Sequence, residues 1–160
     1  MRRALILLLL FCLCLSLFSC GENYGYLELR LEMPRAYETA EAEGSFDRAY
    51  SDGRAVIGIT RLSFEAAIDD GIIETYTPEA FAKYYKKRID KSHLEVYERG
   101  EVPYIIYTEQ KDGVSYFYQC SFYRTKYAYF VVVAVCREDL SEMYSEEFLD
   151  IASSAYIKYK

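Results

Sequence analysis

Between residues 21 and 160, the sequence has one histidine, His93, and two cysteines, Cys120 and Cys136, which are the residue types of Cys–His catalysis and of soft metal sites. A cysteine nucleophile needs an adjacent base such as histidine, because the thiolate is the reactive form. A zinc ion needs several imidazole, thiolate or carboxylate ligands that converge on one point. The chain has one histidine and neither an H-x-x-x-H nor a C-x-x-C spacing. We therefore predict no catalytic residue and no metal site.

Motifs that bind cofactors are missing from the sequence. It contains no P-loop, no dinucleotide-binding glycine pattern and no G-x-S-x-G motif. Asp69-Asp70-Gly71 lacks the D-x-D-x-D-G spacing of a calcium loop and predicts a helix end followed by a turn. Glu146 and Glu147 are expected in the first turn of the last helix, where the helix dipole favours acids. The sequence therefore predicts no cofactor.

Cys120 and Cys136 are an even pair of the kind that forms a disulfide in an exported protein. Both are expected in neighbouring strands of one hairpin centred on Thr125. In that register Cys120 opposes Phe130 and Cys136 opposes Val114, which places the cysteines roughly 20 Å apart along the ladder. A disulfide needs Cα atoms within about 7 Å of each other. We therefore expect two buried, unbridged thiols.

The N-terminal segment indicates where the protein is located. Two arginines precede the apolar run Ala4–Leu15, which is the arrangement of a secretory signal peptide. The segment ends in Leu17-Phe18-Ser19-Cys20, and this ending resembles the lipobox of bacterial lipoproteins. The resemblance implies cleavage before Cys20 and a diacylglyceryl group on its thiol, with Leu17 and Ser19 completing the motif. A plain secreted protein and an uncleaved anchor are the alternatives.

Lipidation of Cys20 determines the expected organisation of the chain. Two acyl chains hold a protein on a membrane firmly, because each buried methylene contributes about 0.8 kcal/mol. Residues 1–19 are then a lipoprotein signal peptide, 20–25 the lipidated cysteine with a short tether, and 26–160 a single α+β domain. We predict a lipid-anchored protein on the extracytoplasmic face of the bacterial cell membrane.

The composition limits the range of partners. Loss of the leader leaves 17 basic against 25 acidic residues, a formal charge of −8. Nucleic acid is not an expected partner, because its binding relies on lysine and arginine at the phosphates. All 18 tyrosines follow the leader, and tryptophan is absent. Tyrosine suits a half-buried sheet surface, and an aromatic binding face for sugars or peptides is the alternative.

The first half of the mature chain has the patterns of strands and a short helix. Alternating apolar and charged residues make Tyr26–Glu32 a half-buried strand. The Asp-Gly pair between Phe46–Tyr50 and Ala55–Leu62 predicts a hairpin. A short helical turn is expected over Phe64–Asp69.

The second half begins with a helix start at Thr77-Pro78-Glu79, which has an N-cap hydroxyl, a proline and an acid in the first turn. This helix is expected to reach about Asp90, with four residues on its inner side: Phe81, Tyr84, Tyr85 and Ile89. Four strands follow, at Leu94–Tyr97, Tyr104–Glu109, Val114–Tyr123 and Tyr127–Cys136. The last strand is apolar on both faces, as in a central strand covered on both sides. A final helix from about Ser145 carries an apolar stripe formed by Phe148, Ile151, Ala152, Ala155 and Tyr156.

This element order predicts an α+β fold: an α/β/α sandwich in which a central, mainly antiparallel sheet is covered by two main helices. The chain resembles the PsbP-like family over roughly residues 26–158. The resembling features are Leu29-x-Leu31-x-Met33-Pro34, Thr77-Pro78-x-x-Phe81-x-x-Tyr84, the meander Tyr104–Cys136 and Phe148-x-x-Ile151-x-x-Ser154. The resemblance implies an α/β/α sandwich with an accessory or binding role and no catalysis.

Two classes of function remain open. The first is a membrane-anchored accessory module that contacts an unknown protein or envelope partner. The second is a small-ligand-binding or enzymatic domain with a pocket between sheet and helices. A closed, two-sided sandwich favours the first class, and an open sheet lined by tyrosine hydroxyls and acids favours the second.

Overall fold

The computed structural model describes residues 27–42, 46–69, 71–73 and 76–159 of the chain. Leu29–Lys158 form one compact unit, and residues 1–28 and 159–160 belong to a second. The predicted lipidation motif of Leu17, Ser19 and Cys20 lies outside the described residues. None of the described helices is long and apolar enough to cross a membrane.

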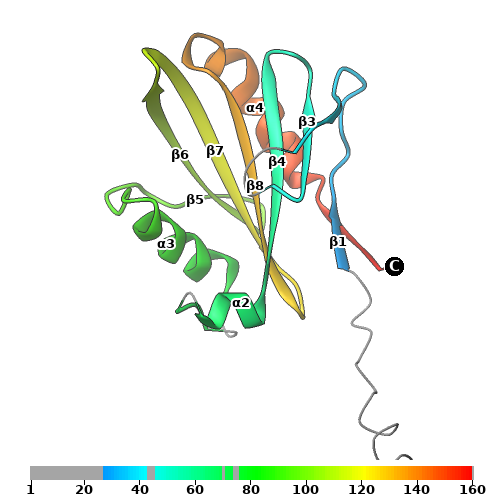
Figure 1. Cartoon of the computed structure of the whole chain (residues 1–160), viewed down its shortest axis with the longest axis vertical. Helices are drawn as coiled ribbons and strands as arrows, with labels where there is room; N and C mark the ends of the chain where they lie inside the picture. The colour runs from blue at the N-terminus through cyan, green and yellow to red at the C-terminus, as the bar shows by residue number, and fades with distance from the viewer. Residues whose placement is uncertain (1–26, 43–45, 70, 74–75, 160) are drawn as a thin grey trace, which may run out of the picture. The chain divides into compact units, whose positions relative to one another are not determined.

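A seven-stranded antiparallel sheet forms the centre of Leu29–Lys158 (Figure 1). Its strands are β2 (Glu38–Ala40), β3 (Arg48–Ser51), β4 (Ala55–Ser63), β5 (Tyr97–Arg99), β6 (Val102–Lys111), β7 (Val114–Arg124) and β8 (Ala128–Arg137). They lie in the order β2, β3, β4, β8, β7, β6, β5. The central place predicted for the last strand is confirmed, because β8 has three strands on either side and is buried from Ala128 to Ala134.

The hairpin predicted at Asp52-Gly53 is confirmed. In the ladder of β3 and β4, Ser51 lies opposite Val56. The Asp52 carboxylate accepts hydrogen bonds from the amides of Arg54 and Ala55 at 2.9 and 2.7 Å. Gly53 has a φ of 86°, a conformation that glycine adopts without strain. The turn is therefore determined by its own residues.

The first strand, β1 (Leu27–Arg30), has the predicted alternation, with both of its leucines buried. It pairs outside the main sheet with a C-terminal strand that the sequence does not predict, β9 (Tyr156–Tyr159). The apolar helical stripe predicted to reach Ala155 and Tyr156 is wrong at its end, because the helix ends at Ser153 and Tyr156 is 50% exposed in β9. The three-residue β2 is also missed, since so short a segment shows no apolar alternation.

The register predicted for the hairpin of β7 and β8 is wrong. Cys120 opposes Val133 instead of Phe130. The reason is the Thr125 hydroxyl, which accepts hydrogen bonds from two backbone amides of the loop at 3.2 and 3.0 Å. A side-chain turn of this kind makes the loop longer than a tight turn centred on Thr125 and shifts the pairing of the strands.

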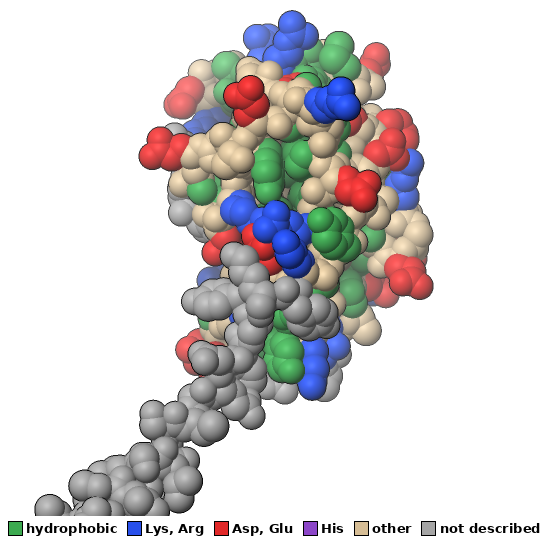
Figure 2. All heavy atoms as spheres, turned by 90° about the vertical axis from the view of Figure 1, so that its right-hand side faces the viewer, with side chains coloured by type: hydrophobic (Ala, Val, Ile, Leu, Met, Phe, Trp, Pro, Cys, Tyr) green, Lys and Arg blue, Asp and Glu red, His purple; other side chains and the backbone are tan. Residues whose placement is uncertain are grey.

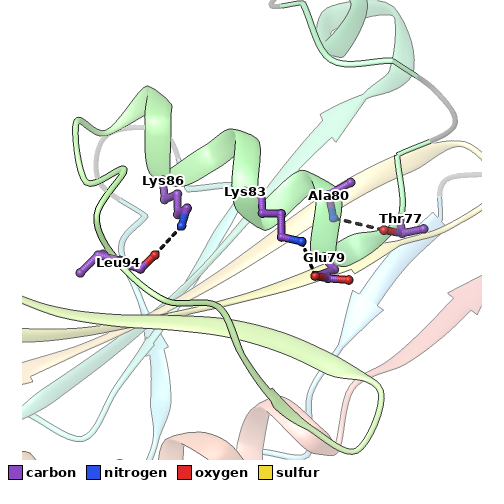
Figure 3. Close-up of polar contacts among 6 residues, drawn as sticks. All are labelled: Thr77, Glu79, Ala80, Lys83, Lys86 and Leu94. Carbon is purple, nitrogen blue, oxygen red and sulfur yellow. Dashed lines mark hydrogen bonds and ion pairs between the residues drawn. The ribbon is translucent and has the colours of Figure 1, made fainter.

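The strand predicted over Leu94–Tyr97 begins later, because pairing with β6 starts where Tyr97 opposes Tyr104. Leu94 and Val96 pack against the core instead. The Leu94 carbonyl accepts a hydrogen bond from the Lys86 ammonium group (Figure 3). The alternating pattern therefore arises because Leu94 and Val96 are partly buried beside the sheet, and the strand itself begins only at Tyr97.

The two helices predicted before β5 are confirmed as α2 (Phe64–Asp69) and α3 (Pro78–Arg88). The Thr77 hydroxyl accepts a hydrogen bond from the Ala80 amide at 3.1 Å, and Lys83 pairs with Glu79 (Figure 3). The threonine satisfies one of the amides that a first helical turn leaves free. The predicted start of α3 is therefore set by local capping.

The last helix, α4 (Ser141–Ser153), begins four residues before the predicted start at Ser145. The reason is Tyr144, which is 5% exposed and extends the buried stripe by one turn. Glu146 and Glu147 therefore lie in the second turn, and their predicted place in the first turn is wrong. Both carboxylates instead accept hydrogen bonds from side chains outside the helix.

Helices cover both faces of the sheet (Figure 1). α2 and α3 lie on one face, over a cluster that contains Phe81 and Tyr129. α4 and the short η1 (Glu138–Leu140) that precedes it belong to the other face, over a cluster that contains Ile57 and Phe148. The predicted α+β sandwich with a mainly antiparallel central sheet is confirmed.

Candidate functional site

The three reactive side chains singled out in the sequence do not come together. Cys120 packs in the cluster under α3 and Cys136 in the cluster under α4, so the sheet lies between the two thiols. Cys136 opposes Phe117 instead of the predicted Val114. His93 is exposed in the turn before β5. The structure therefore forms neither a Cys–His pair nor a thiol pair from these residues.

Both thiols are buried, as predicted, and free in the structure. Burial raises the pKa of the Cys120 thiol to about 12 and that of Cys136 to about 11. Neither thiol therefore forms the nucleophilic thiolate near neutral pH. The absence of a disulfide in the exported protein stays a prediction, and its reason is now the placement of the thiols on opposite faces.

The acidic segment at Asp69 forms the predicted helix end and turn. α2 ends at this residue, and Gly71 has a φ of 83°. Within the described part of the chain, no group of three or more His, Cys, Asp or Glu side chains is placed to hold a metal ion.

A groove of about 230 Å³ lies between α4 and strands β6 and β7, and we call it the α4 groove. It is lined by Tyr104, Ile106, Phe117 and Gln119 from the strands and by Ser141, Glu142, Ser145 and Leu149 from the helix. Most of the surface inside it is apolar. The buried stripe of α4 packs on β8 and β7, and the groove opens where β6 continues the sheet beyond them.

Two buried polar side chains stand on the α4 face of β7. Gln119 is 2% exposed and Ser121 is 1% exposed, and no other described polar residue is buried. They share the face of Phe117, because alternate residues of a strand point the same way. Gln119 lines the α4 groove, and its side chain takes part in none of the hydrogen bonds among the described residues. Its amide atoms are not among the fully buried, unpartnered polar atoms of the described residues, so the little exposure that Gln119 keeps lies at the groove.

The rim of the α4 groove is acidic. Glu142 lines the groove, and Glu146 and Asp150 follow on the same edge of α4 at intervals of four residues. Arg99 donates hydrogen bonds to both, at 2.7 Å each. The bond to Glu146 and the charge of Asp150 raise the pKa of Arg99 above its usual value. The rim of the α4 groove thus has three carboxylates and one guanidinium. On the side of the molecule drawn in Figure 2, by contrast, acidic and basic side chains are interspersed.

Two tyrosine hydroxyls hold α4 on the side that faces away from the groove. Tyr144 donates to Asp52 at 2.5 Å, and Tyr37 donates to Glu147 at 2.8 Å. The hydrogen bond to Asp52 and burial raise the pKa of Tyr144 to about 12. Burial opposes ionisation of Asp52, but the bond from Tyr144 and bonds from backbone amides outweigh it and lower the pKa of Asp52. α4 is therefore fixed to the turn between β3 and β4.

Sequence reasoning did not identify the α4 groove. The signal was present in β7, where Gln119 and Ser121 interrupt an otherwise apolar and aromatic strand at alternate positions. In a sheet covered on both faces, such positions are buried, so polar residues there need a partner. The helix start four residues earlier than expected also hid Ser141 and Glu142 as lining residues.

No protein-family model matches the chain, and no curated protein matches it. Solved structures do share its fold. A crystal structure of LpqN, described as involved in cell envelope biogenesis of Mycobacterium tuberculosis, aligns with a TM-score of 0.55 at 10% identity, covering 86% of this chain and 87% of LpqN. A crystal structure from Bacteroides thetaiotaomicron also gives 0.55 at 10% identity, covering 85% of this chain and 49% of that longer chain.

The solution structure of cyanobacterial PsbP (CyanoP) from Synechocystis sp. PCC 6803 aligns with a TM-score of 0.47 at 12% identity, covering 88% of this chain and 98% of CyanoP. At about 10% identity, the likeness to LpqN and to the Bacteroides protein shows a common α+β fold alone.

Proposed function

We propose that the chain is a lipid-anchored accessory module on the extracytoplasmic face of the bacterial cell membrane, and that it binds a protein partner through the α4 groove without catalysis. The observation that carries the proposal is Gln119, whose side chain lines an open apolar groove and makes no hydrogen bond to the described residues. A bound partner can supply the hydrogen bonds that the chain itself does not give this amide.

The size of the α4 groove favours side chains of a protein over a small molecule. Pockets for drug-sized ligands enclose about 300–1,000 Å³, and this groove has about 230 Å³. The groove is also open and mostly apolar inside, so it would enclose little of a small polar ligand. The alternative of a small-ligand receptor therefore has weaker support.

The state of the reactive side chains supports binding without catalysis. Cys120 and Cys136 are buried with raised pKa values, so they stay protonated at neutral pH. His93 is exposed in the turn before β5, whereas both thiols are buried in strands of the sheet. Glu142 is the one carboxylate among the lining residues, whereas glycoside hydrolysis, for example, needs two.

The proposed location rests on the lipobox resemblance of Leu17, Ser19 and Cys20. LpqN, which shares the fold, is described as involved in cell envelope biogenesis, and that description agrees with a role in an envelope. An anchored module of this kind meets its partner at the membrane surface, so a groove that accepts one or two side chains suffices for docking.

Site-specific photocrosslinking in the native membrane tests the binding half of the proposal. A photoreactive phenylalanine analogue is placed at Ile106 in the groove and, as a matched control, at Val56 on the opposite face. The two positions are similarly exposed, at 36% and 38%. We expect a discrete crosslinked product from position 106 alone. Equal products from both positions, or none from position 106, would refute the groove as the docking site.

Mass spectrometry of the mature protein tests the anchor. We expect a diacylglyceryl group on Cys20 and loss of membrane retention in Cys20→Ala. Cys14→Ala is the matched control, because it changes a cysteine of the leader outside the lipobox. An N-terminus elsewhere, or unchanged retention of Cys20→Ala, would show that the protein is secreted or held by an uncleaved segment.

A further inference from the structure

We propose that the α4 groove recognises a protein segment in which an apolar side chain stands next to a lysine or arginine. The inference rests on the proposed function, because it names the chemistry of the partner at the same site.

The floor of the groove suits an apolar side chain. Ile106, Phe117 and Leu149 line it, and Ile106 is 36% exposed. At about 30 Å³ per water molecule, the groove has room for roughly eight waters. A side chain of the size of leucine or phenylalanine displaces several of them and buries the exposed apolar surface, which is favourable.

The amide of Gln119 adds a polar requirement. It is 2% exposed, lines the groove and has no partner among the described residues. A glutamine side chain offers two donors and one acceptor, which match the carbonyl and the N–H group of a peptide backbone. A protein segment laid over the groove satisfies this amide while its side chain fills the apolar floor.

The charge of the rim selects the neighbour of that side chain. Glu142, Glu146 and Asp150 line one edge of α4, and Arg99 is the basic group bonded to the last two. An acidic segment or an anionic lipid surface is repelled there, whereas lysine or arginine is attracted. Tyr97, which is 40% exposed, packs on Tyr104 at 5.6 Å between ring centroids and offers a ring face to the same cation.

Selection from a displayed library of random heptapeptides tests the inference with the full-length protein in nanodiscs. Ser145→Trp fills the groove, and Met143→Trp is the matched control, because Met143 is 63% exposed on the same helix and does not line the groove. We expect selected peptides to carry an apolar residue beside lysine or arginine. We expect them to bind the wild type and Met143→Trp alike and Ser145→Trp at least about tenfold more weakly, which is 1.4 kcal/mol.

Charge reversal separates the basic requirement from the apolar one. Glu142→Lys should weaken these peptides about tenfold and make their binding less sensitive to salt. Glu138→Lys, in η1 outside the groove lining, should leave binding unchanged. Groove-dependent peptides that are acidic or uncharged would overturn the inference and leave the proposed function standing. An absence of groove-dependent peptides alongside an intact crosslink at Ile106 would also overturn it, whereas loss of that crosslink would overturn the proposed function itself.

Discussion

The two faces of the central sheet are covered differently, although the same strands form both. On the α3 face, aromatic rings close the core. The ring of Phe81 packs edge-on against that of Phe122, with 5.6 Å between the ring centroids, and its centroid lies 4.6 Å from that of Tyr129. On the α4 face, the helix packs on β8 and β7 and leaves the α4 groove between itself and strands β6 and β7. Both buried polar residues, Gln119 and Ser121, stand on this second face.

Neighbouring residues of β7 show what the difference means. Cys120 is fully buried among apolar residues on the α3 face, where it contributes to packing. Gln119 points the other way and is buried without a described partner. The α3 face is closed by packed aromatic rings, and the open part of the α4 face is the surface for which we propose binding.

The largest effect is expected from removing a ring on the closed face. Phe122→Ala should lower the free energy of unfolding by about 3–5 kcal/mol, because Phe122 is 1% exposed and packs on two other aromatic rings. Phe117→Ala, on the same strand and facing the groove, should cost less than half as much. Chemical denaturation measures both. Equal losses would show that the two faces contribute alike to stability.

A smaller effect is expected at the bond that fixes α4. Tyr144→Phe removes the donor to Asp52 and should cost about 1–3 kcal/mol at pH 7. Because the pKa of Asp52 is lowered in the folded protein, its ionised carboxylate stabilises the fold above the unfolded pKa of about 3.9. This stabilisation is lost as the pH falls through the folded pKa. The difference in the free energy of unfolding between Tyr144→Phe and the wild type should therefore become smaller below about pH 4.

Denaturation at pH 7 and at about pH 2.5 checks this dependence. Tyr156→Phe is the control, because Tyr156 is 50% exposed. A difference for Tyr144→Phe that is the same at both pH values would mean that the charge of Asp52 plays no part in holding α4.

Arg99→Ala should have a still smaller effect on stability, because Glu146 and Asp150 are largely exposed and exposed ion pairs contribute little. The same change leaves the rim of the groove more acidic and should strengthen the binding of basic peptides. Denaturation and peptide titration measure the two effects. A large loss of stability would show that these ion pairs hold α4 on the sheet.

The smallest effect is expected at His93, the exposed histidine of the turn before β5. His93→Ala should change stability by no more than about 0.5 kcal/mol and should leave the crosslink at Ile106 and any cellular phenotype intact. Loss of the phenotype with an intact fold would contradict the proposal of a binding protein without catalysis.

The elements that the sequence predicts well are determined by their own residues. The turn at Asp52-Gly53 is closed by the Asp52 side chain, and α3 begins at the Thr77 cap. Errors occur where tertiary contacts decide, as at the start of α4, which depends on burial of Tyr144 against the sheet. The β7–β8 register depends on the Thr125 hydroxyl, whose bonds lengthen the loop in a way that composition does not reveal.

The candidate site is harder to predict for a related reason. The α4 groove combines residues of β6, β7 and α4, and it exists because α4 packs over β8 and β7 without covering β6. Gln119 and Ser121 can be recognised in the sequence as polar residues of β7. Their place on one face of the sheet becomes informative only when the position of α4 over that face is known. Reactive residue types pointed to His93, Cys120 and Cys136 instead, and none of these lines the groove.

The substitution Gln119→Leu tests the central claim most directly, because it keeps the size of the side chain and removes its amide. If Gln119 is kept for binding, the free energy of unfolding of the variant should stay within about 1 kcal/mol of the wild type, since no hydrogen bond between described residues is lost. The crosslink from Ile106 to the partner should disappear in the same variant. A clear loss of stability with an unchanged crosslink would contradict the account and show that Gln119 serves the fold.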